Sequence, residues 1–211
     1  GRFYGANDID GLRSQLHQSI WLTLGLGVMG TLSIVMAATL LMDAGFEAGM
    51  ASRANDYLLA IAWGAIPMTM LPALRGSLEA MSLTRAVLWI NFSIFIINIP
   101  LDYFLIYGIY GFPQLGAEGC AWATALLLWL GLFANLAMLN WHHSIRHLSV
   151  FRYFQWPQWQ RIRDTFILGL PIGFSVLIEM SMFSGAGMLI AYFGPTATSA
   201  HSVAISIASA S

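Results

Sequence analysis

Five long apolar stretches restrict the fold of this sequence more than any other feature. Three of them carry no charged residue, and the third and the fifth carry one acid each. About 20 apolar residues, rising about 1.5 Å each, are needed for a helix to cross the hydrocarbon core of a bilayer. A lipid-facing strand would instead alternate apolar and polar residues. The sequence therefore predicts an all-α fold, a polytopic membrane helix bundle. The stretches are Ile20 to Met42, Tyr57 to Leu74, Ala86 to Tyr107, Cys120 to Trp141 and Thr165 to Phe193, and a sixth begins near Thr198.

Composition supports a membrane environment. Of the 211 residues, 58% are hydrophobic and only 9% are charged, whereas soluble domains carry about 25% charged residues. The surplus of apolar surface is too large for one core and has to face lipid. The net charge of -1 and the absence of a basic cluster argue against nucleic acid as a partner. A single cysteine, Cys120, rules out a disulfide framework.

The basic residues, which are all arginines, predict the orientation. Eight of the nine lie before the first stretch, between the second and third, or between the fourth and fifth, and only Arg53 lies on the opposite side. Under the positive-inside rule, the side with eight arginines is cytoplasmic. We therefore expect a multi-pass protein of the cell inner membrane. The long connection 142–164 mixes aromatic residues with four arginines, which suits either the lipid headgroup layer at the cytoplasmic face or a linker between two halves of the protein.

Two acids lie within the predicted spans. A carboxylate at the bilayer centre costs about 2.5 kcal/mol or more, so such residues normally face a cavity and bind a cation. Glu179 lies near the middle of the fifth span, and its alternative role is a protonated acid tied to a neighbouring helix. Asp102 lies five residues before Tyr107, so its alternative place is the outer interface.

Polar neighbours single out Asp102. Asn98 lies one helical turn earlier on the same face. Pro100, between the two, cannot donate a hydrogen bond to the carbonyl of Ile96. Amide, carbonyl and carboxylate oxygens are the ligands that small cations prefer, and interrupted helices line ion sites in many transporters.

No catalytic residue is predicted, so we do not expect an enzyme. The only histidine in a span is His201, and the sequence has no lysine to pair with a serine. His143 and His147 are one turn apart, but they have no nearby carboxylate or thiol that would complete a zinc site. Arg75 and Glu79 have the spacing of an interfacial ion pair.

Four sequence runs resemble the MATE (multidrug and toxic compound extrusion) family, in particular its NorM-type members. The most specific is NIPLDYFLIYGIYGFPQLGAEGCAWATA from Asn98. The others are LRGSLEA at Leu74, LGLPIGFSVLIEMSMF at Leu168 and AHSVAIS at Ala200. Their order is that of the family, and the resemblance covers nearly the whole chain. It implies a two-lobe architecture that is incomplete here, and we expect an internal segment of a longer protein.

The resemblance implies a division of the chain into three parts. Residues 1–141 would form helices 3 to 6 of the N-lobe. Residues 142–164 would be a cytoplasmic linker between the lobes. Residues 165–211 would form helix 7 and the start of helix 8 in the C-lobe.

The resemblance also implies a function and a set of site residues. Members export cationic or aromatic drugs in exchange for Na⁺ or H⁺ and need no other cofactor. Glu179 matches an acid of helix 7 that serves cation coupling. Asn98, Asp102 and Thr124 resemble a polar cluster of the N-lobe, where Na⁺ would bind. NorM-type sequences usually have Asn in place of Asp102, so both ions stay open.

The alternative within the same superfamily is a lipid-linked oligosaccharide flippase. Its cavity would need positive charge to hold pyrophosphate. The predicted spans contain acids and no arginine, which favours the drug exporter.

Overall fold

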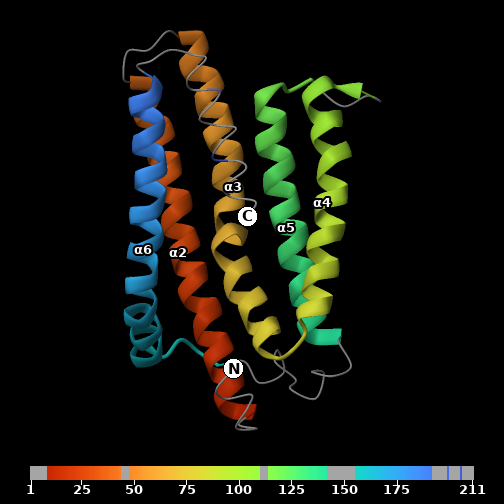
Figure 1. Ribbon diagram of the computed structural model, residues 1–211, viewed down its shortest axis with the longest axis vertical. Coiled ribbons are helices and arrows are strands. Elements are labelled where there is room, and N and C mark those ends of the chain that lie inside the picture. The colour runs from red at the N-terminus through yellow and green to blue at the C-terminus, as the bar shows by residue number, and fades with distance from the viewer. Residues whose placement is uncertain are drawn as a thin grey trace. The chain divides into compact units, whose positions relative to one another are not determined.

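The predicted all-α class is confirmed in a computed structural model that describes residues 9–43, 48–109, 114–141 and 155–191, together with 199 and 205. Five helices make up the described part of the chain (Figure 1), and no strand occurs there. The connection 142–154 and the start of the expected sixth span lie outside the described residues.

All five predicted spans are helices, and all five are long and apolar enough to cross a membrane. The first, α2, has 35 residues and is therefore roughly 50 Å long. This exceeds the hydrocarbon thickness of about 30 Å, so its ends reach the headgroup layers. The chain is a multi-pass membrane protein. The helices are α2 (Ile9–Asp43), α3 (Ala48–Ala80), α4 (Thr84–Tyr107), α5 (Ala117–Trp141) and α6 (Trp159–Ala191).

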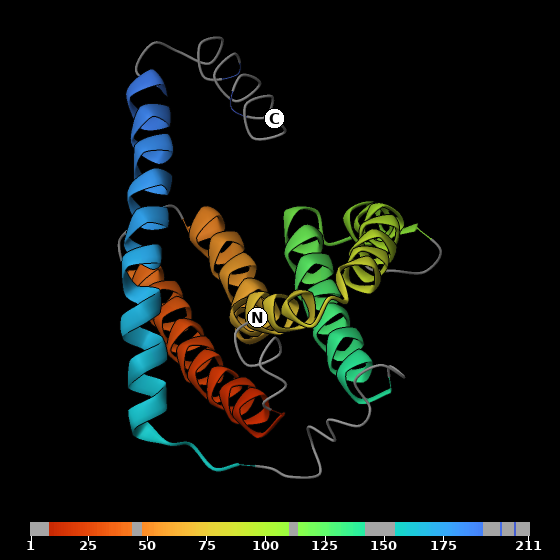
Figure 2. The same cartoon turned by 60° about the horizontal axis from the view of Figure 1, so that its bottom comes forward.

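The first four helices pack in the order α2, α3, α5, α4, which differs from their order in the sequence. Helix α3 lies between α2 and α5, and α4 packs mainly on α5, as both views show (Figures 1 and 2). Because α3 also touches α4, the helices α3, α4 and α5 together surround a common space. This arrangement positions the candidate site described below.

The packed interior is concentrated where α3 meets its neighbours, and most large apolar side chains elsewhere are exposed. Met29 of α2 is 65% exposed and Trp89 of α4 is 65% exposed. A soluble protein would not present apolar surface on this scale, whereas lipid solvates it without cost. The buried cluster consists of Leu16, Met70, Leu71, Leu74, Leu78, Met81, Val87, Leu132 and Leu139.

Helices α2 and α3 approach most closely at Gly27. A Cβ atom at this position would lie 2.7 Å from the hydroxyl oxygen of Thr69 and 2.9 Å from the Cα of Ile66. Two threonine hydroxyls bridge the helices here: Thr69 donates to the carbonyl of Thr23 (2.9 Å), and Thr31 donates to that of Ala62 (3.2 Å). Close contact between small residues with bridging hydroxyls is how helices associate in lipid, where no hydrophobic effect holds them together.

A left-handed glycine ends α4. Gly108 has φ +68°, and its N–H donates to the carbonyl of Phe104 at 2.9 Å. Helix α4 itself runs from Thr84 through Pro100 to Tyr107 as one element. This turn brings α5 back along α4, so that residues of the two helices face each other.

Hydrogen bonds join residues 155–161, which precede and begin α6, to α2. The side chain of Gln18 is fully buried. Its Nε2 donates to the carbonyl of Trp156 at 3.0 Å, and its Oε1 accepts from the N–H of Gln158 at 2.7 Å. The guanidinium of Arg161 donates to the hydroxyl of Ser14 at 2.8 Å. The last part of the predicted linker is thus ordered, and α6 begins within it at Trp159.

The chain divides into two compact units, residues 1–162 and residues 163–211. The first contains α2 to α5, and the second contains most of α6. The assignment of 1–141 and 165–211 to two lobes joined by a linker at 142–164 stays a prediction.

Candidate functional site

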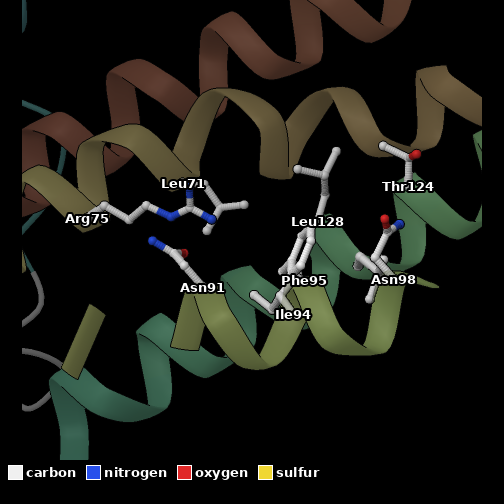
Figure 3. A pocket seen from close by; sticks show the side chains of 9 residues that line it. Leu71, Arg75, Asn91, Ile94, Phe95, Asn98, Thr124 and Leu128 are labelled. Carbon is white, nitrogen blue, oxygen red and sulfur yellow. The ribbon is translucent and has the colours of Figure 1, made fainter. Parts of the chain in front are cut away.

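A cavity of about 440 Å³ lies between α3, α4 and α5 (Figure 3). Its wall is mainly apolar, with polar side chains at its two ends. A mostly apolar cavity with a few convergent polar groups is typical of a small-molecule site. The lining residues are Leu71 and Arg75 of α3, Asn91, Ile94, Phe95 and Asn98 of α4, and Thr124, Leu127 and Leu128 of α5.

Two of the predicted site residues meet at one end of this cavity. Asn98 of α4 and Thr124 of α5 both line it, and Figure 3 shows their side chains together there. The Thr124 hydroxyl donates to the carbonyl of Cys120 at 2.9 Å, which leaves its lone pairs available as acceptors. The structure therefore brings together two oxygen ligands that are 26 positions apart in the sequence.

Asp102 continues the same face of α4 one turn beyond Asn98, but it does not line the cavity. Its Oδ1 atom is buried and has no hydrogen-bond partner within the described part of the chain. Along α4, Asp102 lies between Asn98 and Leu105. Asn98 lines the cavity together with Thr124, and the carbonyl of Leu105 lies close to Gly119 of α5. A buried carboxylate oxygen without a donor is unstable unless a cation or a proton joins it.

Together these three side chains offer oxygen atoms of the kind that bind small cations. Asn98 supplies an amide carbonyl, Thr124 a hydroxyl and Asp102 a carboxylate. Such donors suit Na⁺, and the carboxylate also suits H⁺. No group of three or more histidine, cysteine or acidic side chains that could hold a metal ion occurs among the described residues.

At the other end of the cavity lie Arg75 and Asn91, and the structure contradicts one prediction there. Arg75 and Glu79 were expected to form an interfacial ion pair, but the Nε of Arg75 is buried and has no hydrogen-bond partner in the described residues. Glu79 is exposed, whereas the arginine side chain lines the cavity with Asn91 (Figure 3). The direction of the Arg75 side chain depends on how α3 packs against its neighbours. The i, i+4 pairing rule considers one helix alone and therefore does not predict this direction.

Helix α3 continues past the predicted end of the span at Leu74 to Ala80. Arg75, which was expected outside the span, therefore lies inside the helix and lines the cavity. Asn91 was not predicted at all. It precedes Asn98 by seven residues, which places both on one face of α4, and this spacing could have identified it.

Glu179, the fourth predicted site residue, lies on α6 in the second unit. It lies in a span whose most apolar 18 residues have a mean hydropathy of 1.9. The cavity belongs entirely to the first unit. Glu179 is therefore not among the residues that line the cavity.

Comparisons with known proteins identify the family. The MatE family model matches residues 1–104. A probable multidrug resistance protein NorM of Acinetobacter baylyi is 34% identical over 199 residues, which cover 92% of this chain and 43% of that protein. The chain belongs to the MATE family. Further similar proteins are a probable multidrug resistance protein NorM of Idiomarina loihiensis, 32% identical over 97% of the chain, and the multidrug resistance protein NorM of Vibrio cholerae, 30% identical over 92% of it.

This MATE chain spans less than half the length of these curated relatives. It covers 43% of the Acinetobacter protein, 44% of the Idiomarina protein and 43% of the Vibrio protein. The matches extend over nearly all of the chain, so the family assignment applies to both units.

Proposed function

We propose that this chain is part of a multidrug efflux antiporter, which exports cationic or aromatic drugs across the cell inner membrane in exchange for Na⁺ or H⁺. The observation that carries this proposal is the similarity to multidrug resistance proteins over more than nine tenths of the chain. The polar stripe of α4, which consists of Asn98 and Asp102, supports it, because these side chains offer oxygen atoms of the kind that bind small cations and lie within a helix long and apolar enough to span a membrane.

In this mechanism, cation and drug stabilise different arrangements of two lobes. The cation binds the oxygen atoms of Asn98, Asp102 and Thr124, while Glu179 supplies a carboxylate in the other lobe. Since a ligand shifts a conformational equilibrium only by its differential affinity for the two states, the coupling requires that the cation and the drug favour opposite states. A bound cation would give the buried oxygen of Asp102 a partner.

A lipid-linked oligosaccharide flippase of the same superfamily is the second candidate. The observation in its favour is Arg75, which adds positive charge to the cavity. A pyrophosphate carries more than one negative charge, however, and Arg75 is the only basic residue among the described residues that line this cavity. The names of the relatives also favour the drug exporter.

Ethidium accumulation in cells tests the proposal. Cells that lack their own drug pumps and express the full-length protein should hold several-fold less ethidium than cells with an empty vector. Collapse of the Na⁺ and H⁺ gradients should abolish the difference, because export then loses its driving force. Equal accumulation with and without the protein would contradict the proposal, and restored oligosaccharide translocation in a flippase-deficient strain would favour the second candidate.

A further inference from the structure

Arg75 and Asn91 form an end of the cavity that the proposed transport cycle does not use. Figure 3 shows the two side chains together, opposite the end that holds Asn98 and Thr124. The Nε of Arg75 and the Oδ1 of Asn91 are both buried, and neither has a hydrogen-bond partner in the described residues. A guanidinium stays charged at any physiological pH, so this end of the cavity is permanently positive.

No acid of the described residues neutralises this charge. Glu79 is exposed, and no ion pair with Arg75 occurs in the part of the chain that the structure describes. Asp102 lies 11 residues from Asn91 along α4, which corresponds to roughly 16 Å. Because the buried Nε leaves a donor of the charged guanidinium without an acceptor, the cavity fits a ligand that carries an anion.

The wall between the two polar ends is apolar and reaches an exposed apolar face of α4. Leu71 and Leu127 are buried within the bundle, whereas Phe95 lines the cavity and is 61% exposed. Phe92 and Ile99, on the same helix, are 49% and 60% exposed. A hydrocarbon chain could therefore run from the cavity onto the outer face of α4 without meeting a polar group.

The position along the bilayer fits the same kind of ligand. Arg75 lies near the end of α3 and Asn91 near the start of α4, on the side that the arginine distribution predicts to be cytoplasmic. Anionic lipids are concentrated in that leaflet, and basic pockets between transmembrane helices on the cytoplasmic side bind their headgroups.

We propose that this cavity binds an anionic phospholipid. The phosphate accepts hydrogen bonds from the guanidinium of Arg75 and the amide of Asn91, and one acyl chain lies against Phe95 and the exposed face of α4. This site does not depend on drug transport, so its test is independent of the function proposed above.

Native mass spectrometry of the purified full-length protein, titrated with lipid, tests the proposal. The wild type should bind phosphatidylglycerol with about tenfold higher affinity than phosphatidylcholine, because the choline cation of phosphatidylcholine offsets the phosphate charge that attracts Arg75. Arg75→Gln should remove the preference. Arg75→Lys should retain part of it, because lysine keeps the charge but cannot bind a phosphate through two parallel hydrogen bonds.

Matched variants distinguish a specific lipid site at Arg75 from a general attraction of anionic lipid to positive charge. Arg85, an exposed arginine of the first turn of α4, lies outside the cavity, so Arg85→Gln should leave the preference unchanged. Asn91→Leu keeps the side-chain size and should weaken phosphatidylglycerol binding about threefold, as expected for one lost hydrogen bond. It also provides a second readout if Arg75→Gln fails to fold.

Any one of three binding results would overturn the proposal, and so would displacement of the lipid by inorganic phosphate. The three binding results are equal binding of the two lipids to the wild type, an unchanged preference in both Arg75→Gln and Asn91→Leu, and equal losses in Arg75→Gln and Arg85→Gln. Inorganic phosphate at the same concentration should not displace phosphatidylglycerol, because it lacks the apolar contacts. Displacement by phosphate would show a site for free phosphate instead of lipid.

Discussion

Replacement of Glu179 by glutamine in the full-length protein is expected to abolish drug export while the protein still folds. Glutamine keeps the size of the side chain and removes the charge. The loss of a charged hydrogen bond to a cation or a cationic drug should lower the export rate at least about tenfold. Folding should survive, because a neutral amide is easier to bury in a span than a carboxylate. Efflux of ethidium from loaded cells measures the rate.

The matched control is Glu79→Gln, the same chemical change at an exposed position near the end of α3. This variant should export at the wild-type rate, and both variants should be present in the membrane at wild-type amounts. Wild-type export by Glu179→Gln would mean that Glu179 has a structural role only.

The second large effect concerns folding. Gly27→Leu should prevent assembly of α2 with α3, because the first atom of any side chain at this position would overlap the backbone of Ile66 and the hydroxyl of Thr69. Extra atoms in a packed interior cost about 1 to 3 kcal/mol, and here two hydrogen bonds between the helices, those of Thr69 and Thr31, would also be lost. Fluorescence-detected size-exclusion chromatography should show aggregate in place of a monodisperse peak.

Gly25→Leu is the control for this variant. Gly25 lies on the same helix, is exposed, and would have nothing within 4 Å of an added Cβ. The substitution should be neutral or slightly stabilising, because leucine is a better helix former than glycine. Equal behaviour of Gly25→Leu and Gly27→Leu would contradict the close crossing of α2 and α3.

The sequence located all five helices because the signal is physical and local. A stretch without charge that is long enough to cross hydrocarbon has no stable conformation there other than a helix or a closed barrel. The helix ends were less accurate. Helix α2 begins at Ile9, well before the predicted Ile20, and α6 begins at Trp159 instead of Thr165. Helical hydrogen bonding continues into the headgroup layer, where charges are tolerated and hydropathy no longer marks the helix.

The neighbour order of the helices and the direction of single side chains were not predictable in the same way. The apolar stretches, taken one at a time, do not indicate which helices are neighbours. They therefore do not predict that α3, and not α4, packs between α2 and α5. The meeting of Asn98 with Thr124 followed from family resemblance, and the structure places them at one cavity. Arg75 was assigned to the wrong partner, because its direction depends on the space between α3 and α4.

Asp102 is the residue that we expect to couple drug export to H⁺. Its carboxylate is the charged member of the stripe on α4, and its buried Oδ1 lacks a partner in the described residues. A carboxylate can take up and release a proton, whereas an amide at the same position cannot. Asp102→Asn should therefore fold normally and lose the export that is driven by H⁺, while any export that is driven by Na⁺ should persist, because an amide oxygen still binds Na⁺.

The most direct measurement is ethidium efflux from proteoliposomes that contain the full-length protein, under an imposed pH gradient and, separately, an imposed Na⁺ gradient. We predict that at least one gradient accelerates efflux by the wild type, and that Asp102→Asn loses several-fold of the component driven by the pH gradient. Two results would contradict the account: efflux by the wild type that neither gradient accelerates, or efflux by Asp102→Asn that equals the wild type under both gradients.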